Sequence, residues 1–157
     1  MSNSWGDSGI LVRPKGYVEP CPVISRIGER ELYLGNAAAA DNEAHDRAFA
    51  FVLSLTADSH PSTTHHRPLR DGPGNEWCAF RDAVETAREL SRRQGSLLVH
   101  CKAGVSRSSA VLATMLAAKE GRRFREALEL VQQARPVAMP HPALHELAVV
   151  YLAADKA

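Results

Sequence analysis

The chain has 157 residues, of which 45% are hydrophobic and 24% charged, as in a single soluble globular domain. Its 19 basic and 18 acidic side chains leave a net charge of +1, so global charge favours neither nucleic acid nor an anionic membrane as the main partner. The N-terminus lacks a signal-peptide pattern and the apolar runs are too short to span a bilayer, so we expect a cytoplasmic protein without a membrane anchor.

The first half of the chain predicts a flexible lead followed by strands. Residues 1–22 are rich in Gly, Pro and Ser and predict the flexible N-terminal lead. The stretch "VISRIGERELYLG" predicts two short strands joined by a turn at 28–30. Asp41 is expected to cap a short helix over "NEAHDRA", and "FAFVLSL" predicts a strand covered on both faces. Residues 56–68 predict a loop.

The second half predicts helices around one central strand. Asn75 is expected to cap a helix from Glu76 to Arg93, whose apolar residues recur every three or four positions. "SLLVH" predicts the central strand, and a helix follows Arg107 and stops at Gly121. "FREALELVQQA" and "PALHELAVVYLAA" predict two further helices. This order predicts an α/β fold, with a central, mostly parallel sheet flanked by helices.

The central strand runs through a glycine-containing loop directly into a helix. Such a turn aims several backbone N–H groups and the positive end of the helix at one point, where a phosphate-like anion binds. Gly104 lets the loop curl, and Arg107 offers a planar fork to two phosphate oxygens. Cys101 opens the loop, so its thiolate is stabilised there and aimed at phosphorus. His100 is expected to fix the loop by hydrogen bonding.

Transfer of a phosphoryl group to sulfur also needs a proton for the departing oxygen. Asp71 lies on a Gly/Pro loop about 30 residues before Cys101, where a mobile general acid belongs. Asp82 is the next candidate but falls in mid-helix, and Asp58 follows it. Arg70 and its basic neighbours Arg67, His66 and His65 form either one rim of the cleft or an ordinary solvated loop.

Two plainer interpretations of the cysteines and histidines are weighed against this chemistry. A lone buried cysteine is usually an inert part of the core. If Cys101 were one, its neighbours Gly104 and Arg107 and the strand-to-helix turn would have to occur together by chance. No cysteine or histidine spacing suits a metal, so no metal site is expected. The three cysteines form no paired pattern, which suits a reducing compartment. Cys21 or Cys78 is either an ordinary thiol or a partner that protects Cys101 as a reversible disulfide.

The stretch "VHCKAGVSRSS" resembles the signature of the cysteine-dependent protein tyrosine phosphatase superfamily, and its "AGVSRS" form resembles the dual-specificity branch. "RIGERELYLGNAAAA" resembles that branch's N-terminal strand pair, "PLRDGPGN" its general-acid loop, and "EALELVQQARPVAMPHPALHELAVVYL" its C-terminal helices. The resemblance covers residues 24–152 and implies a single-domain phosphatase fold, so we expect a catalytic domain over 23–157. Residues before 23 have no clear counterpart.

The resemblance also implies roles for individual residues. Cys101 becomes the nucleophile, Arg107 the phosphate clamp, and Asp71 the acid and then the base that activates water. Ser108 helps the thiolate leave in the second step. The phosphate cradle consists of Lys102, Ala103, Gly104, Val105, Ser106 and Arg107. No cofactor is implied.

Three function classes remain open from the sequence. The favoured one is a monomeric, metal-independent phosphatase of phosphotyrosine on proteins, with phosphoserine and phosphothreonine left open. The second acts on a phosphoinositide, a phospholipid head group or an RNA 5′ phosphate. The stretch "HCKAG" resembles that of lipid-directed family members, which share Lys102. Those members have a further basic residue in the loop, where this chain has the uncharged Val105 and Ser106. The third is a catalytically inactive phosphate-binding module, which has no need of a thiolate or an acid.

Overall fold

The computed structural model describes residues 19–156, which form short strands and four α-helices. The strands are β1 (Ile24–Arg26), β2 (Leu32–Gly35), β3 (Phe51–Ser54), β4 (His65–His66) and β5 (Leu97–His100). The α-helices are α2 (Trp77–Arg92), α3 (Arg107–Glu120), α4 (Phe124–Ala134) and α5 (Pro142–Asp155). Two short 3₁₀ helices, η1 (Ala37–Ala40) and η2 (Asn42–Ala44), follow β2.

The five strands form one sheet in the order β1-β2-β5-β3-β4. Only the β1–β2 pair is antiparallel; the other three pairs are parallel, which confirms the predicted mostly parallel sheet. In the ladder, His100 at the end of β5 lies opposite Gly35 on one side and Ser54 on the other. The carboxyl ends of the three central strands therefore meet at one edge, where open α/β sheets bind their ligands.

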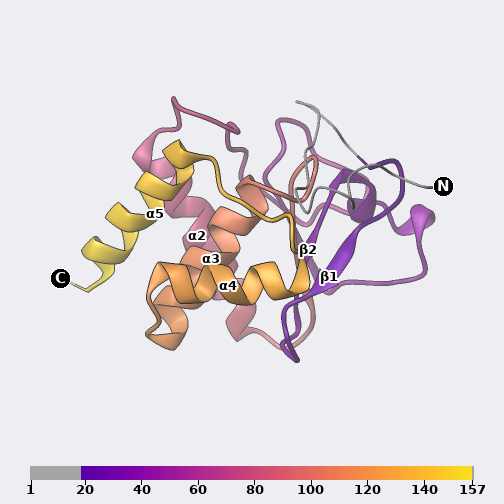
Figure 1. The fold of residues 1–157 in the computed structure, drawn as a ribbon. Helices are drawn as coiled ribbons and strands as arrows, with labels where there is room; N and C mark the ends of the chain where they lie inside the picture. The colour runs from indigo at the N-terminus through magenta and orange to yellow at the C-terminus, as the bar shows by residue number, and fades with distance from the viewer. Residues whose placement is uncertain (1–18, 157) are drawn as a thin grey trace, which may run out of the picture.

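Both faces of the sheet are covered, as its bare apolar strands predict. All four α-helices lie on one side of the sheet (Figure 1), where Leu34 and Val99 join the main core. On the other side Tyr33 and Leu98 pack with Ala39 of η1 in a smaller cluster. The alternation of residues along β2 and β5 thus divides the core into two unequal layers.

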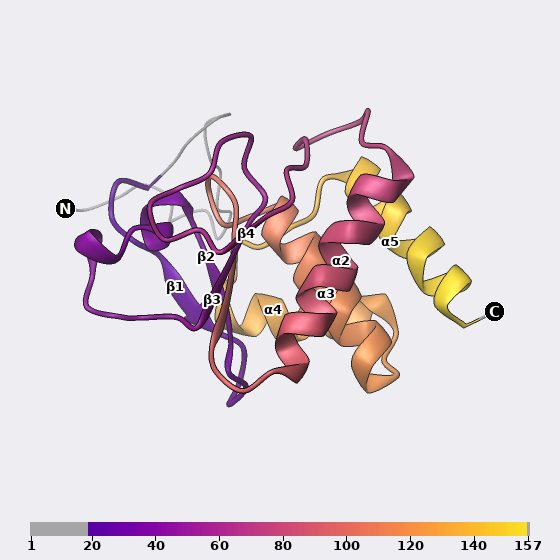
Figure 2. The same ribbon diagram turned by 180° about the vertical axis from the view of Figure 1, so that it is seen from behind.

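Helix α3 is the centre of the helical layer. Every residue from Ser108 to Ala117 is buried, and the helix contacts α2, α4 and α5. Figure 2 shows α2 crossing in front of it. The helix ends, as predicted, at Gly121, whose φ of 66° is left-handed and favours glycine. Because α3 is buried on all sides, the position of its first turn is fixed by packing. That turn directly follows the loop that begins at Cys101.

Three local expectations differ from the structure. The loop predicted over 56–68 contains the two-residue strand β4, which pairs with β3. Asp41 does cap, but the helix after it is the single 3₁₀ turn η2, which ends before His45. Asn75 does not cap α2: its side chain bonds to Arg70 and Gly72 and closes the preceding loop. Asparagine amides satisfy nearby backbone groups in this way when a tight loop offers them.

The predicted N-terminal lead falls mostly outside the described residues, which begin at 19. The buried Asn36 side chain holds the described residues just before β1, since its Nδ2 donates to the Cys21 carbonyl at 2.9 Å. Its Oδ1 accepts from the Val23 N–H at 2.9 Å. No helix within residues 19–156 is long and apolar enough to cross a membrane.

Candidate active site

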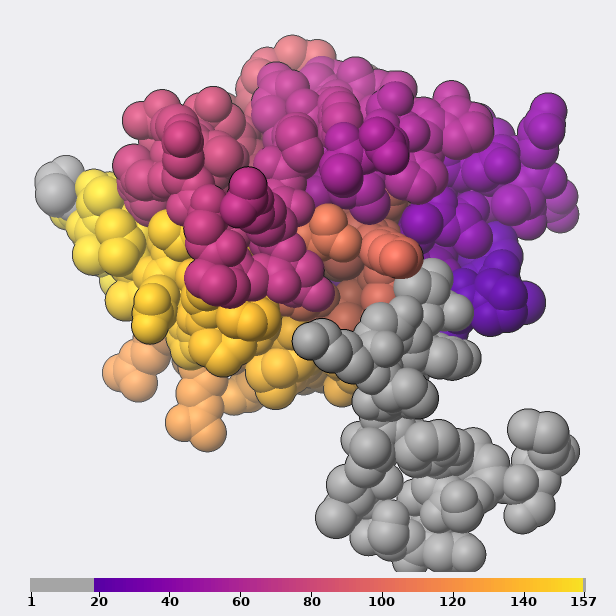
Figure 3. Space-filling model, turned by 90° about the horizontal axis from the view of Figure 1, so that it is seen from above, coloured from indigo at the N-terminus to yellow at the C-terminus, as the bar shows by residue number. Residues whose placement is uncertain are grey.

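The predicted strand–loop–helix is present, with β5 ending at His100 and α3 beginning at Arg107. Viewed from above, the loop between them lies at the centre of one face, surrounded by segments from other parts of the chain (Figure 3). Gly104 has a φ of +68°, and a side chain there would bring its Cβ within 3.0 Å of the Gly35 carbonyl oxygen. The loop therefore needs glycine at this position for both its conformation and its close packing on β2.

The backbone carbonyls of this loop, which we call the phosphate loop (residues 101–106), point outward to other elements. The Lys102 carbonyl accepts from the Ala37 N–H at 3.0 Å, and the Val105 carbonyl accepts from the Met139 N–H at 2.9 Å. The carbonyls of Ala103 and Gly104 accept from the Arg135 guanidinium, and that of Ser106 accepts from the N–H of Ala110, the fourth residue of α3.

The N–H groups of the phosphate loop are left free. Within residues 19–156, no N–H from Lys102 to Ser106 donates to another group, although the Cys101 N–H donates to Gly35. A trans peptide unit points its C=O and N–H in opposite directions, so outward carbonyls leave the N–H groups facing inward. Consecutive unpaired N–H groups beside a helix N-terminus make an anion-binding cradle.

Cys101 and Ser108 meet beneath this cradle. Cys101 is only 2% exposed, and its Sγ lies 3.2 Å from the Ser108 Oγ. Ser108 is fully buried in the first turn of α3. The hydroxyl can therefore donate to the sulfur, which stabilises a thiolate at this position.

The Arg107 guanidinium is held from behind by two carbonyls of other loops. Its Nη1 donates to Leu69 O at 3.2 Å and to Leu55 O at 3.4 Å. Its Nε is the one buried side-chain nitrogen or oxygen within residues 19–156 that has no partner. An unsatisfied buried donor costs roughly 1–3 kcal/mol, so an oxyanion that accepts from Nε would remove this cost.

His100 lies on the sheet side of the loop, which the sequence predicts it to fix by hydrogen bonding. It is fully buried, its Nε2 bonds to the Ser54 hydroxyl, and its Nδ1 lies 3.4 Å from the Cys101 carbonyl. Ser54 in turn bonds to Thr63 at 2.7 Å. Burial, and secondarily the neighbouring His60, lower the pKa of His100 from 6.5 to about 4. The ring is therefore neutral at physiological pH.

This lowered pKa predicts acid sensitivity in a defined pH window. The unfolded chain binds a proton at His100 near pH 6.5, whereas the folded protein binds it only near pH 4. Stability from this residue is thus complete above pH 6.5 and falls as the pH drops towards 4, by roughly 3 kcal/mol. NMR titration of the His100 ring should give a midpoint near pH 4. A midpoint near 6.5 would contradict the prediction.

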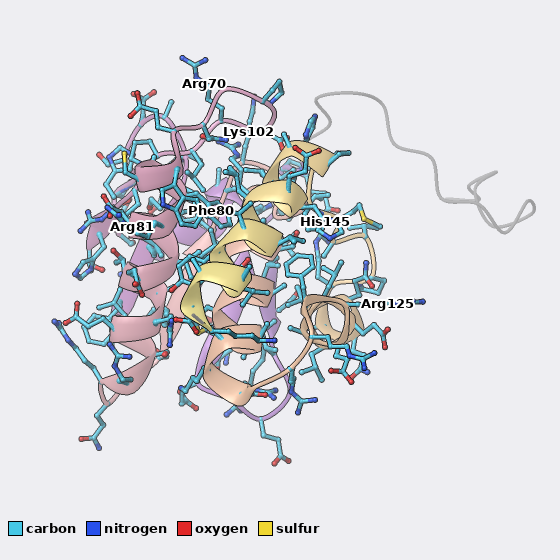
Figure 4. The ribbon with its side chains drawn as sticks, turned by 90° about the vertical axis from the view of Figure 1, so that its left-hand side faces the viewer. Arg70, Phe80, Arg81, Lys102, Arg125 and His145 are labelled. Atoms are coloured by element: carbon cyan, nitrogen blue, oxygen red, sulfur yellow. The ribbon has the colours of Figure 1, made fainter. Side chains whose placement is uncertain are left out.

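The loop of Asp71 lies at the same end of the molecule as the phosphate loop. Figure 4 shows Arg70 of the first loop and Lys102 of the second both near this end. Leu69, two residues before Asp71, holds Arg107 through its carbonyl. Asp71 itself is exposed, on a loop closed by the Asn75 side chain. The loop of Asp71 is thus connected to Arg107 through Leu69 and is closed by Asn75. An exposed carboxyl on such a loop suits a group that must reach over a bound ligand.

The two alternative acids are placed differently. Asp82 is exposed on α2 and pairs with the adjacent Arg81 at 3.6 Å. Asp58 lines a cavity of about 410 Å³ that opens beside the cradle. The cavity is lined by Ala37, Thr56, Ala57, Asp58, Ser59, His60, Lys102 and Arg107. Asp58 therefore adjoins the site, whereas neither Asp82 nor Asp71 lines this cavity.

The basic residues proposed as a rim do not line this cavity. Arg67 bonds to Thr86 of α2 at 3.2 Å, and His66 bonds to the Thr56 carbonyl at 2.7 Å. Arg70 remains exposed on the loop of Asp71. Among residues 19–156, no group of three or more His, Cys, Asp or Glu side chains has an arrangement that could hold a metal.

All three cysteines are free. Cys21 and Cys78 are exposed, whereas Cys101 is buried. The Cys78 thiol, at the start of α2, lies 3.6 Å from a Glu76 carboxylate oxygen. A protective disulfide from either exposed cysteine to Cys101 stays a prediction.

Comparison with known proteins identifies the family. The family described as the dual specificity phosphatase catalytic domain matches residues 32–151, which include both the loop of Asp71 and the phosphate loop. The chain belongs to the dual specificity phosphatase family. It is 34% identical over 121 residues to dual specificity protein phosphatase 1 of Arabidopsis thaliana, covering 72% of this chain and 61% of that protein. It is 33% identical over 119 residues to dual specificity phosphatase 28 of Homo sapiens, covering 71% and 68%.

Solved structures of dual specificity phosphatases share the fold. A variant of human DUSP28 matches with a TM-score of 0.75 and 28% identity, covering 86% of this chain and 97% of that one. A mouse putative dual specificity phosphatase complexed with zinc tungstate gives 0.72 and 27%, covering 90% and 94%. The predicted α/β phosphatase fold is thereby confirmed. The match spans less than two thirds of the Arabidopsis protein.

In this dual specificity phosphatase, sequence reasoning missed the outer supports of the phosphate loop. Arg135 and Asn36 hold, respectively, the loop and the segment beside it. Both lie in stretches that resemble the family, but the sequence assigned no role to either residue. Arg135 follows the end of a predicted helix, where an isolated arginine is usually solvated.

Proposed function

We propose that this protein is a metal-independent phosphatase that hydrolyses phosphate monoesters on proteins, phosphotyrosine foremost, through a cysteinyl-phosphate intermediate. One observation carries the proposal. Within the described residues, five consecutive N–H groups and the Nε of Arg107 lack partners around a buried thiol. Donors fixed in advance around one point bind a tetrahedral oxyanion and stabilise the charge of its transition state. The thiol beneath supplies the nucleophile.

In the first step the Cys101 thiolate attacks phosphorus. A sulfur–phosphorus bond forms, the ester P–O bond breaks, and Asp71 gives its proton to the departing oxygen. Arg107 and the loop N–H groups hold the other phosphate oxygens.

In the second step water attacks the cysteinyl phosphate. The Asp71 carboxylate takes a proton from the water as the sulfur–phosphorus bond breaks. Ser108, 3.2 Å from the sulfur, donates to the departing thiolate. The cycle ends with inorganic phosphate and with Asp71 protonated again, so no cofactor is consumed.

The cavity beside the cradle favours a protein substrate over a polyanionic lipid. Its charged lining residues are Lys102, Arg107 and Asp58, and Arg107 is the clamp of the first phosphate, so a second phosphate has only the Lys102 ammonium. A second phosphate placed there meets the carboxylate as well as the ammonium, and like charges repel strongly near a partly dry site. A flanking peptide residue carries no such charge requirement. We place the protein in the cytoplasm because its cysteines are free and unpaired in sequence, and expect it to act as a monomer.

Asp71→Asn tests the mechanism. With phenyl phosphate or phosphoserine, whose oxygens leave poorly, kcat/KM should fall by roughly a hundredfold or more. A nitrophenyl ester, whose oxygen needs less protonation, should lose much less. The alkaline limb of the kcat/KM profile should flatten, because no acid remains to lose its proton. Steady-state rates across leaving groups and pH measure all three effects.

Unchanged pH profiles and equal losses for all leaving groups in Asp71→Asn would place the acid elsewhere. Asp58, which lines the adjoining cavity, is then the next residue to replace. Asp82→Asn is the matched control, since this carboxyl lies on the exposed face of α2 beside Arg81. It should leave both the rates and the pH profile unchanged.

A further inference from the structure

The segment between α4 and α5 runs along the outer side of the phosphate loop. It donates hydrogen bonds to four consecutive loop residues. Arg135 donates to the carbonyls of Ala103 and Gly104, each at 3.2 Å. The backbone of the same segment donates to the Val105 carbonyl at 2.9 Å and to the Ser106 hydroxyl at 2.8 Å. One short segment thus sets the orientation of much of the loop.

Arg135 makes the only side-chain contribution to this support. Its side chain is 11% exposed, and the guanidinium donates from Nη2 to Ala103 O and from Nε to Gly104 O. Since peptide units are planar and trans, turning these two carbonyls outward turns the N–H groups of Gly104 and Val105 inward. These are the middle donors of the cradle, so Arg135 determines where they point.

Glu19 holds Arg135 in turn. Its Oε1 lies 3.3 Å from the Arg135 Nη2, and its side chain is 25% exposed. The backbone at Glu19 and Cys21 is held in place by the buried Asn36 side chain. Its Nδ2 donates to the Glu19 carbonyl at 3.4 Å and to the Cys21 carbonyl at 2.9 Å. The next residue, Ala37, donates to Lys102 O. Glu19 therefore supports the phosphate loop through Arg135, and Ala37 contacts the loop directly.

We propose that Glu19 and Arg135 form a clasp that holds the phosphate loop in its anion-binding shape. Arg135 is a positioning residue, acting through the carbonyls of Ala103 and Gly104, and Glu19 acts through Arg135. Arg135 is not itself a substrate ligand, because its side chain is largely buried and already bonded to three groups. The inference rests on the proposed function, since it concerns the same cradle.

The test compares Arg135→Met, Glu19→Gln and the double variant with wild type. Tungstate affinity is measured by calorimetry, and the iodoacetate alkylation rate of Cys101 is measured against pH. Losing two charge-assisted hydrogen bonds should weaken tungstate binding by about tenfold or more in Arg135→Met. The pH at which alkylation sets in should rise. Arg135→Lys, which keeps the charge but cannot bridge both carbonyls, should recover only part of the affinity.

Glu19→Gln should weaken tungstate binding severalfold in the wild-type background and have no effect in Arg135→Met. Residues acting as one unit give such non-additive effects. The matched control is Arg125→Met on α4, whose side chain is 90% exposed and projects away from the site (Figure 4). It should bind tungstate like wild type.

Two results would overturn the clasp. One is a folded Arg135→Met protein with wild-type tungstate affinity and alkylation profile. If Arg135→Met does not fold, Glu19→Gln decides, and an unchanged affinity there rejects the proposal. A wild-type protein that binds no tungstate and hydrolyses no aryl phosphate would instead contradict the proposed function, and the clasp with it.

Discussion

Replacing Cys101 with serine is expected to abolish turnover while leaving oxyanion binding largely intact. The cradle consists of backbone N–H groups and Arg107, none of which the substitution removes. The hydroxyl is not ionised at neutral pH and is a poor nucleophile for phosphorus, so kcat should fall by roughly a thousandfold or more. Hydrolysis of nitrophenyl phosphate measures the loss, and tungstate calorimetry measures the retained binding.

The same variant identifies substrates. A protein that binds phosphate esters without cleaving them should hold phosphorylated partners long enough for isolation and mass spectrometry. The control is Cys101→Ser combined with Arg107→Met, which lacks the guanidinium and should capture none of them. Residual activity above about a thousandth of wild type would count against Cys101 as the nucleophile.

Arg107→Lys should be nearly as severe, although the charge is kept. The guanidinium uses Nη1 to hold the carbonyls of Leu55 and Leu69, which leaves Nε for the anion. A lysine ammonium cannot reproduce a planar fork that bonds in two directions at once. Removing one preorganised donor from an oxyanion site costs roughly a hundredfold in rate, so kcat/KM should fall by at least about that factor.

The loss in Arg107→Lys should appear in binding and in chemistry together. Tungstate affinity and kcat should both fall, because the guanidinium contacts the phosphate oxygens in the ground state and in the transition state. Lys102→Met is the comparison variant. It removes an exposed cation that lines the adjoining cavity and leaves the backbone N–H groups of the cradle in place. Its activity towards nitrophenyl phosphate should change far less. An Arg107→Lys enzyme within a few-fold of wild type would exclude Arg107 as the clamp.

The elements with strong local signals were predicted well. The apolar stripe of α2, the buried run of β5 and the stop of α3 at Gly121 all appear where their patterns place them. Each depends on neighbours in the chain, through helical spacing, strand burial or a left-handed glycine. β4 was missed because two residues carry no periodicity, and pairing with β3 alone makes them a strand. Asn75 was misplaced because a cap and a loop closure look alike in sequence.

The sequence by itself predicted the chemistry proposed for the candidate site, because its central parts are adjacent in the chain. A strand, six loop residues and a helix start keep Cys101, the loop N–H groups and Arg107 close together along the chain, which is enough to predict an anion site there. Only the tertiary structure decided what holds them there. The carbonyls behind Arg107 come from residues 38 and 52 positions away, and the Arg135 contact to Gly104 spans 31. Such partners are selected by how whole elements pack, and packing leaves no periodic trace along the chain.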